Sequence, residues 1–212
     1  MEYLPLTFSR RHGDPSRPWN KFSIDVRNEK DERVLNYQGN WRDIFQNWEA
    51  LAFSYPKFIE SMISKFLNNS TADGYNPYRV TKDGFDWETI EPDNPWSYIG
   101  YWGDHQIIYL QKFLELSKKY QPAELKELLN AEVFSYANVP YEIEGVEKLF
   151  ADPKNTVIFN DDKQAIIENR VSELGSDGRL LLAADNSVYM VNLTEKLLVP
   201  LLAKLGNLVL DG

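Results

Sequence analysis

The sequence predicts a mainly helical protein that also carries a small β-hairpin and long aromatic-rich loops. Several stretches repeat apolar residues at every third or fourth position, the spacing that places side chains on one face of a helix. Alternating apolar residues, which are typical of strands, are confined to short segments. Hydrophobic residues make up 43% of the 212 residues, which is enough for a buried core.

Composition limits the classes of partner. The net charge is −9 and no basic face is apparent, which argues against nucleic acid and against an anionic membrane surface. The chain has no cysteine, and its N-terminal stretch has no apolar core of the kind found in signal peptides. We therefore expect a soluble cytoplasmic protein. Aromatic residues make up 14% of the chain, and many are accompanied by Asp, Asn and Gly, a composition that suits sugar ligands.

The first 36 residues are expected to form an irregular lead-in with one short strand. Four breakers, at Pro5, Gly13, Pro15 and Pro18, interrupt its first half. Alternating apolar residues at 22, 24 and 26 predict the strand, and the charged residues 28–33 predict a turn. Residues 37–212 are expected to form the main helical domain.

An αα-hairpin is predicted at the start of this domain. Asn40 is a suitable N-cap for a first helix, and Pro56 occupies a favourable first position for a second. The connection at Tyr55–Pro56 is short enough for antiparallel helices. The expected buried residues of the two helices are Trp41, Ile44, Phe45, Trp48, Leu51 and Ala52, then Phe58, Ile59, Met62, Ile63, Phe66 and Leu67.

The rest of the chain is predicted to alternate helices with loops. A long loop covers 68–103, and helices follow from Asp104 and from Pro122. A loop with Pro140 and Pro153 precedes a helix over 161–174. Residues 178–191 resemble a β-hairpin that turns at 185–186, and a last helix begins after Asn192. The buried residues expected in these later helices are Ile107, Leu110, Phe113, Leu114, Leu125, Leu128 and Leu129, then Leu197, Leu198, Leu201, Leu202 and Leu205.

The polar side of the first predicted helix is the first candidate site. Arg42, Gln46 and Glu49 fall in one row, with Asp43 and Asn47 beside it. One interpretation is a solvated face with an internal ion pair. The other is a row of groups that bind sugar hydroxyls, since Arg donates and Asp accepts.

Two further segments are candidates. Asp104 precedes a helix, beside Trp102 and His105; it is either an N-cap or a carboxylate at the mouth of a pocket. Tyr75 and Asn76 lie in a stretch rich in turn residues, or line a groove. A metal site built from Asp104 and the two histidines lacks a ligand-spacing motif, so no metal site is expected. No phosphate loop, dinucleotide fingerprint or nucleophile elbow occurs.

The segments "NWRDIFQNWEA" and "GYWGDHQIIYLQKFLEL" resemble those of the six-hairpin (α/α)6-toroid glycoside hydrolases and phosphorylases, which include glucoamylase-like and cellobiose phosphorylase-like enzymes. Arg42, Asp43 and Gln46 match a family segment similar to "YRDSNQD" that holds the sugar, with Asn47 in place of its second Asp. Asp104 and His105 match a later Asp-His pair, where Gly103 replaces the preceding Asp.

This resemblance implies that the chain is a fragment of such an enzyme, forms part of the toroid, and is inactive by itself. It implies sugar-binding roles for Arg42, Gln46 and His105. The further sugar-binding candidates, chosen for their aromatic or polar side chains, are Trp41, Asn47, Tyr75, Asn76 and Trp102. If the enzyme hydrolyses glycosides, the catalytic candidates are Asp43, Glu49 and Asp104. The substrate would be an oligosaccharide or glycoside, with no cofactor, or with inorganic phosphate if the enzyme is a phosphorylase. The alternatives are a non-catalytic carbohydrate-binding module and a helical interaction module.

Overall fold

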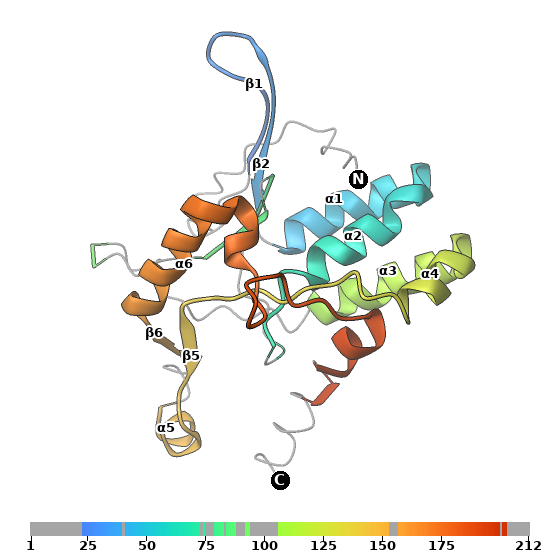
Figure 1. Cartoon of the computed structure of the whole chain (residues 1–212). Coiled ribbons are helices and arrows are strands. Elements are labelled where there is room, and N and C mark those ends of the chain that lie inside the picture. The colour runs from blue at the N-terminus through green and yellow to red at the C-terminus, as the bar shows by residue number, and fades with distance from the viewer. Residues whose placement is uncertain are drawn as a thin grey trace.

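A computed structural model describes residues 23–39, 41–72, 74, 79–82, 84–87, 92–93, 106–152, 157–199 and 201–202. This part of the chain is mainly helical, as the sequence predicts (Figure 1). The helices are α1 (Trp41–Ser54), the 3-10 helix η1 (Pro56–Phe58), α2 (Ile59–Leu67), α3 (Gln106–Tyr120), α4 (Pro122–Leu128), α5 (Val146–Ala151), α6 (Asp161–Leu174) and the 3-10 helix η2 (Gly175–Arg179). The strands are β1 (Ser23–Arg27), β2 (Arg33–Gly39), β3 (Arg79–Thr81), β4 (Gly84–Asp86), β5 (Tyr141–Ile143) and β6 (Val157–Phe159).

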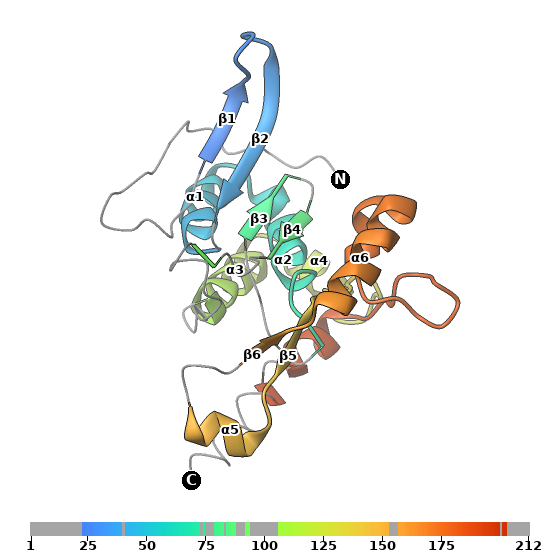
Figure 2. The same ribbon diagram turned by 90° about the vertical axis from the view of Figure 1, so that its left-hand side faces the viewer.

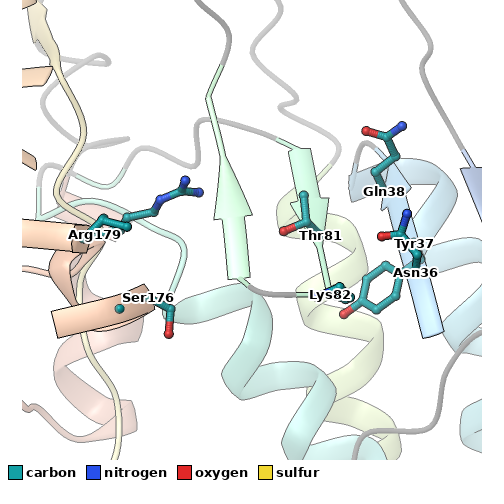
Figure 3. Close-up of a pocket in the computed structure, with 9 residues that line it drawn as sticks. Asn36, Tyr37, Gln38, Thr81, Lys82, Ser176 and Arg179 are labelled. Carbon is teal, nitrogen blue, oxygen red and sulfur yellow. The ribbon is translucent and has the colours of Figure 1, made fainter. Parts of the chain in front are cut away.

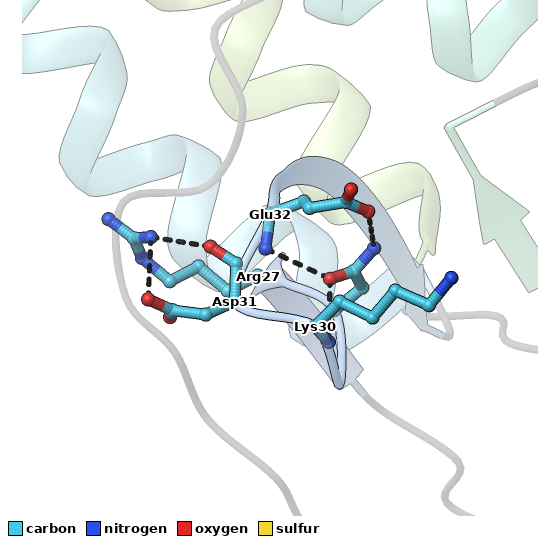
Figure 4. A network of polar contacts seen from close by, with 5 residues as sticks. Arg27, Lys30, Asp31 and Glu32 are labelled. Carbon is cyan, nitrogen blue, oxygen red and sulfur yellow. Dashed lines mark hydrogen bonds and ion pairs between the residues drawn. The ribbon is translucent and has the colours of Figure 1, made fainter.

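Strands β1 and β2 form a hairpin that projects from the helices (Figures 1 and 2). Its tip is the charged turn that the sequence predicts (Figure 4). The Asn28 side chain accepts hydrogen bonds from the backbone N–H groups of Lys30 and Glu32, both at 3.0 Å. Arg27 donates to the backbone oxygen of Asp31 at 2.7 Å and pairs with its carboxylate. These local contacts account for the tight turn.

The predicted loop over 68–103 contains a second hairpin, which corrects that prediction. Strands β3 and β4 pair with each other, and β3 also pairs with β2 through the register Gln38↔Thr81, so that one antiparallel sheet has the order β1-β2-β3-β4. Phe85 is buried, which explains why this short segment is ordered against the body. Strand β2 also crosses the expected boundary at residue 36, and it leads directly to α1.

Helices α1 and α2 form the predicted αα-hairpin. All six apolar residues expected to be buried in α1 are buried, as are five of the six expected in α2. The Phe66 ring, near the end of α2, lies 5.0 Å from the rings of Trp41 and Phe45 near the start of α1. The two helices therefore run antiparallel.

Helix α3 packs on both members of this hairpin. Near its end, Ser117 donates to Glu60 at the start of α2, at 2.7 Å. Nearer its start, the Tyr109 ring stacks on Phe45, with centres 5.2 Å apart and planes 7° apart. Because α2 runs antiparallel to both of its neighbours, α1 and α3 are parallel. Their N-terminal ends therefore lie at the same end of the helix layer (Figure 1).

Predicted burial is mostly confirmed in α3 and α4. Leu110 and Phe113 are buried, and Leu114, Leu125 and Leu128 are partly buried against the main core. Leu129 is exposed instead, because α4 ends one residue earlier. The side chain of Ile107 lies outside the described part.

A second core lies beneath α6, whose predicted limits are confirmed. The Asn160 side chain caps the helix by accepting from the Lys163 N–H at 2.9 Å, and Gly175 ends it with φ of 67°. The stretch around Pro140 and Pro153, predicted as a loop, also contains β5, α5 and β6. The β5–β6 pair is stabilised by Tyr141, which is buried and whose ring lies 5.4 Å from that of Phe159.

The hairpin predicted at 178–191 is only partly confirmed. The turn falls at the predicted place, where Asn186 has φ of 64° and the Ser187 N–H donates to Asp185. Its limbs form isolated bridges rather than a ladder. These bridges are Leu182↔Val188 within the segment, and Phe134↔Val191 and Ala137↔Leu180 to the chain between the two cores.

The last helix, over 193–199 and 201–202, is capped as predicted by Asn192, which accepts from the Glu195 N–H at 2.9 Å. Its predicted leucine stripe is wrong for three of its five residues. Leu198, Leu201 and Leu202 are exposed, whereas Leu193 and Lys196 are buried. The helix is rotated so that Lys196, which an apolar pattern assigns to solvent, faces the protein. Leu197 is partly buried, and Leu205 lies outside the described residues.

Gly178, in η2, allows that turn to pack against the end of α6. A Cβ atom at position 178 would lie 2.5 Å from backbone atoms of Arg170 and Val171. Backbone cannot move as a flexible side chain does, so we predict that Gly178→Ala lowers the free energy of unfolding by about 1–3 kcal/mol.

Gly145→Ala is the matched control, because a Cβ there meets nothing within 4 Å and its φ is −61°. Gly145 is the N-cap of α5, where Ala is less favourable than Gly, so we expect a loss of at most about 1 kcal/mol for this variant. Urea unfolding followed by far-UV circular dichroism measures both, and equal effects of the two substitutions would contradict the assignment.

Candidate functional site

The residues of the first helix that were predicted to bind a sugar differ in burial and in contacts. Trp41 is only 1% exposed, and its ring packs against Phe45, Trp48 and Phe66. It therefore serves the core and has no exposed face for a ligand. Arg42 and Asp43 belong to the first turn of α1, and their side chains lie outside the described part of the structure.

Farther along α1, Gln46 is exposed and Asn47 is half-buried. Glu49 forms an ion pair with Lys112 of α3, with 3.2 Å between Oε1 and Nζ. The sequence interpretation of an ion pair on this face is thus partly right, but the partner comes from another helix rather than from Arg42. Glu49 therefore helps to join α1 to α3.

The other predicted site residues, which are Tyr75, Asn76, Trp102, Asp104 and His105, lie outside the described residues. Asp104 and His105 directly precede Gln106, the first residue of α3. For Asp104 and His105, the structure therefore gives only the position and direction of α3, the helix that follows them. The starts of α1 and α3 lie at the same end of the layer, where the positive ends of both helix dipoles lie.

The structure also contains a cleft of about 420 Å³ that the sequence did not indicate (Figure 3). It lies between the β2–β3 part of the sheet on one side and the end of α6 with η2 on the other. Its charged lining residues are Lys82 and Arg179. No sequence motif connects these positions, because only the tertiary fold brings η2 to the sheet.

Two contacts help to hold Arg179 in place. Its Nη1 donates to the backbone oxygen of Phe85 at 2.6 Å, and its guanidinium carbon lies 5.4 Å from the centre of the Trp87 ring. A hydrogen bond and a cation–π contact together fix a planar guanidinium more firmly than either does alone. The positive charge on this wall of the cleft therefore has a defined position.

Lys196 is a second unusual cation. Its Nζ lies 3.7 Å from the centre of the Tyr136 ring and 3.4 Å from the backbone oxygen of Ser70. Burial lowers the pKa of the Lys196 amine to about 7, and the charge of Glu195 opposes this shift. Burial also raises the pKa of Tyr136, which donates to Glu195 at 3.2 Å; the negative charge of Glu195 adds to this rise.

The described residues contain neither a candidate metal-binding cluster nor a helix that could span a membrane. Within these ranges, no three His, Cys, Asp or Glu side chains are grouped so that they could hold a metal ion, and both histidines lie outside them. None of the described helices combines the length and the apolar composition needed to cross a bilayer.

Comparison of the sequence with models of known protein families and with curated proteins finds no match.

The buried amine of Lys196 predicts a pH dependence of stability. Its pKa is about 7 in the folded protein and about 10.5 when it is exposed, so between these values the unfolded state binds more protons. The free energy of unfolding should therefore rise with pH across this window. Between pH 7 and 9 the contribution of this one group is about 2 kcal/mol.

Lys196→Met keeps most of the apolar stem and removes the titrating amine. We expect its free energy of unfolding to lack that rise when both proteins are unfolded with urea at pH 7 and at pH 9. Identical pH dependence in the two proteins would contradict the assignment.

Proposed function

We propose that this chain forms part of the sugar-binding site of a carbohydrate-active enzyme, either a glycoside hydrolase or a glycoside phosphorylase. The observation that supports the proposal most is the parallel packing of α1 and α3. The two segments that resemble the toroid enzymes are the start of α1 and the residues that lead into α3. Two parallel helices in contact bring such segments to one end of the molecule.

The residues at this end carry suitable chemistry. Arg42 supplies hydrogen-bond donors and Asp43 supplies acceptors, a pair suited to neighbouring hydroxyl groups. Asp104 and His105 would approach the same ligand from the start of α3, with Trp102 as a stacking surface for the sugar ring. The positive ends of two helix dipoles would favour ionised carboxylates here.

Two of the earlier candidates are left out of this site. Trp41 is buried in the core, and Glu49 is paired with Lys112. Exposed Gln46 and half-buried Asn47 remain as further groups on the ligand side of α1. The proposed site therefore rests on the first two turns of α1 and on the segment before α3.

Hydrolysis and phosphorolysis differ in the number of protein carboxyl groups that they need. Hydrolysis with inversion needs two carboxyl groups about 6.5–9.5 Å apart, one acting as acid and one as base. In phosphorolysis, inorganic phosphate replaces the attacking water and one protein carboxyl suffices. We assign sugar contacts to Asp43 and Asp104.

The exposed leucines of the last helix favour a second candidate function, that of a helical interaction protein. Leu198, Leu201 and Leu202 are 47%, 54% and 62% exposed. An exposed apolar stripe of this kind is typical of a helix that packs against another protein surface. This candidate predicts self-association or partner binding without affinity for sugars.

Calorimetric titration with a panel of neutral mono- and oligosaccharides, together with assays for released sugar, tests the proposal. We expect binding of at least one sugar, and we expect Asp43→Ala and Asp104→Ala each to weaken it by about tenfold or more, since each removes a charged hydrogen-bonding group. Glu127→Ala is the control, because it removes an exposed carboxylate from α4. Its affinity should equal that of the unchanged protein.

Three results would argue against the sugar site. These are no binding of any sugar in the panel, unchanged affinity in both aspartate variants, and an equal loss in the Glu127→Ala control. Light scattering on the same samples tests the second candidate. A concentration-dependent rise in mass that Leu201→Gln abolishes, together with no sugar binding, would favour the interaction protein.

A further inference from the structure

We propose that α5 and the adjoining end of β5 form a docking surface for a basic, amphipathic segment of a partner protein. Ile143, Val146 and Phe150, which are all exposed, form this α5 surface. The inference does not rest on the proposed sugar site, because that site uses the start of α1 and the residues before α3. It is carried by the exposure of the three apolar side chains and by the charge around them.

The first step concerns exposure. Ile143 is 52% exposed, Val146 is 47% exposed and Phe150 is 62% exposed. None of the six residues of α5 is buried, and none of its apolar residues packs against either of the two cores that the structure describes. Apolar side chains that remain in water to this extent favour contact with another apolar surface, because contact removes them from water.

The second step concerns the position of these side chains. Val146 and Phe150 are four residues apart, so they lie on the same face of α5. Only two residues separate Val146 from Ile143, the last residue of β5, and the pairing Ile143↔Val157 fixes this strand end against β6. Figures 1 and 2 show α5 at the far end of β5, away from α1 to α4. A partner can therefore reach the α5 surface without displacing either core.

The third step concerns charge, which identifies the kind of partner. Residues 141–162 include six acidic residues and two lysines, a net charge of −4 out of −9 for the whole chain. One of these lysines, Lys148, already forms an ion pair with Glu144. Glu147 is exposed in the first turn of α5. Basic side chains that flank apolar ones complement this surface.

The same charge argues against two other occupants. A second copy of the chain would bring this acidic region against an identical one if the two copies were related by twofold symmetry, and like charges then repel. An anionic membrane surface would be repelled in the same way. A basic partner segment is the occupant that uses both the apolar side chains and the negative charge.

Fluorescence anisotropy with three labelled peptides of equal length tests this inference. The first peptide places Leu on one face of a helix and Lys on the other, the second has Ser in place of Leu, and the third has Glu in place of Lys. We expect the Leu–Lys peptide to bind at least about tenfold more tightly than either of the others. Higher salt should weaken its binding, because screening acts on exposed charges.

Two pairs of matched variants locate the binding surface. Phe150→Ser is compared with Phe53→Ser, because Phe53 is 57% exposed on α1 and lies outside the α5 surface. Glu147→Gln is compared with Glu124→Gln, since both residues are exposed in the first turn of a short helix. We expect Phe150→Ser to weaken binding of the Leu–Lys peptide by about tenfold and Glu147→Gln by about threefold. Both control variants should bind like the unchanged protein.

Every outcome bears on the inference. Absence of Leu–Lys binding overturns it, as does equal affinity for the Ser–Lys peptide, because charge alone then explains binding. Equal losses in Phe150→Ser and Phe53→Ser, or in the two glutamate variants, place the binding elsewhere and also overturn it. The glutamate pair decides if the melting temperature shows that Phe150→Ser is not folded. Failure of the proposed sugar site would appear instead with neutral sugars and in the aspartate variants.

Discussion

The packing around Phe45 is the constraint on which the arrangement of α1, α2 and α3 depends. This side chain is completely buried at the point where α1, α2 and α3 meet. Aromatic pairs prefer tilted or offset contacts at such distances, so a single ring with several partners fixes direction as well as spacing. Its ring contacts are Trp41 at 5.7 Å, Trp48 at 5.8 Å, Phe66 at 5.0 Å, Tyr109 at 5.2 Å and Phe113 at 5.2 Å.

This packing connects the core to the proposed function. The apolar face of α1 is used to hold α2 and α3, while Gln46, on the other side of the helix, is exposed. Because Phe45 also holds α3 parallel to α1, the segments leading into the two helices share one end of the layer. The ion pair between Glu49 and Lys112 supports the same arrangement at the surface, although an exposed pair contributes little energy.

Much of the fold could be predicted from the sequence, for reasons that particular residues make clear. Helices with strong caps or initiating residues, such as Asn160 and Pro56, were predicted with nearly correct limits. The short strands β3 to β6 were missed, because strands of three residues have no recognisable alternation and are stabilised by their tertiary partners. The orientation of the last helix was also missed, because the apolar pattern cannot show that Lys196 is buried while Leu198 is exposed.

The candidate sites, like the fold, could be predicted from the sequence only in part. The sequence indicated the polar residues of α1, since their helical spacing can be read directly. It could not indicate the cleft, because Lys82 and Arg179 are far apart in the chain and only the fold places both along one cleft. For Trp41 the sequence led to two predictions: its helical spacing predicted burial, whereas it was also a candidate for sugar binding, and the structure supports burial.

The distance between positions 43 and 104 tests the central claim most directly. The chain has no cysteine, so Asp43→Cys with Asp104→Cys gives two unique sites for spin labels. We predict a distance between the labels within about 20 Å, because packed helices lie about 8–10 Å apart. A distance beyond about 25 Å, longer than a helix of the size of α3, would put the two positions at opposite ends of the layer and contradict it.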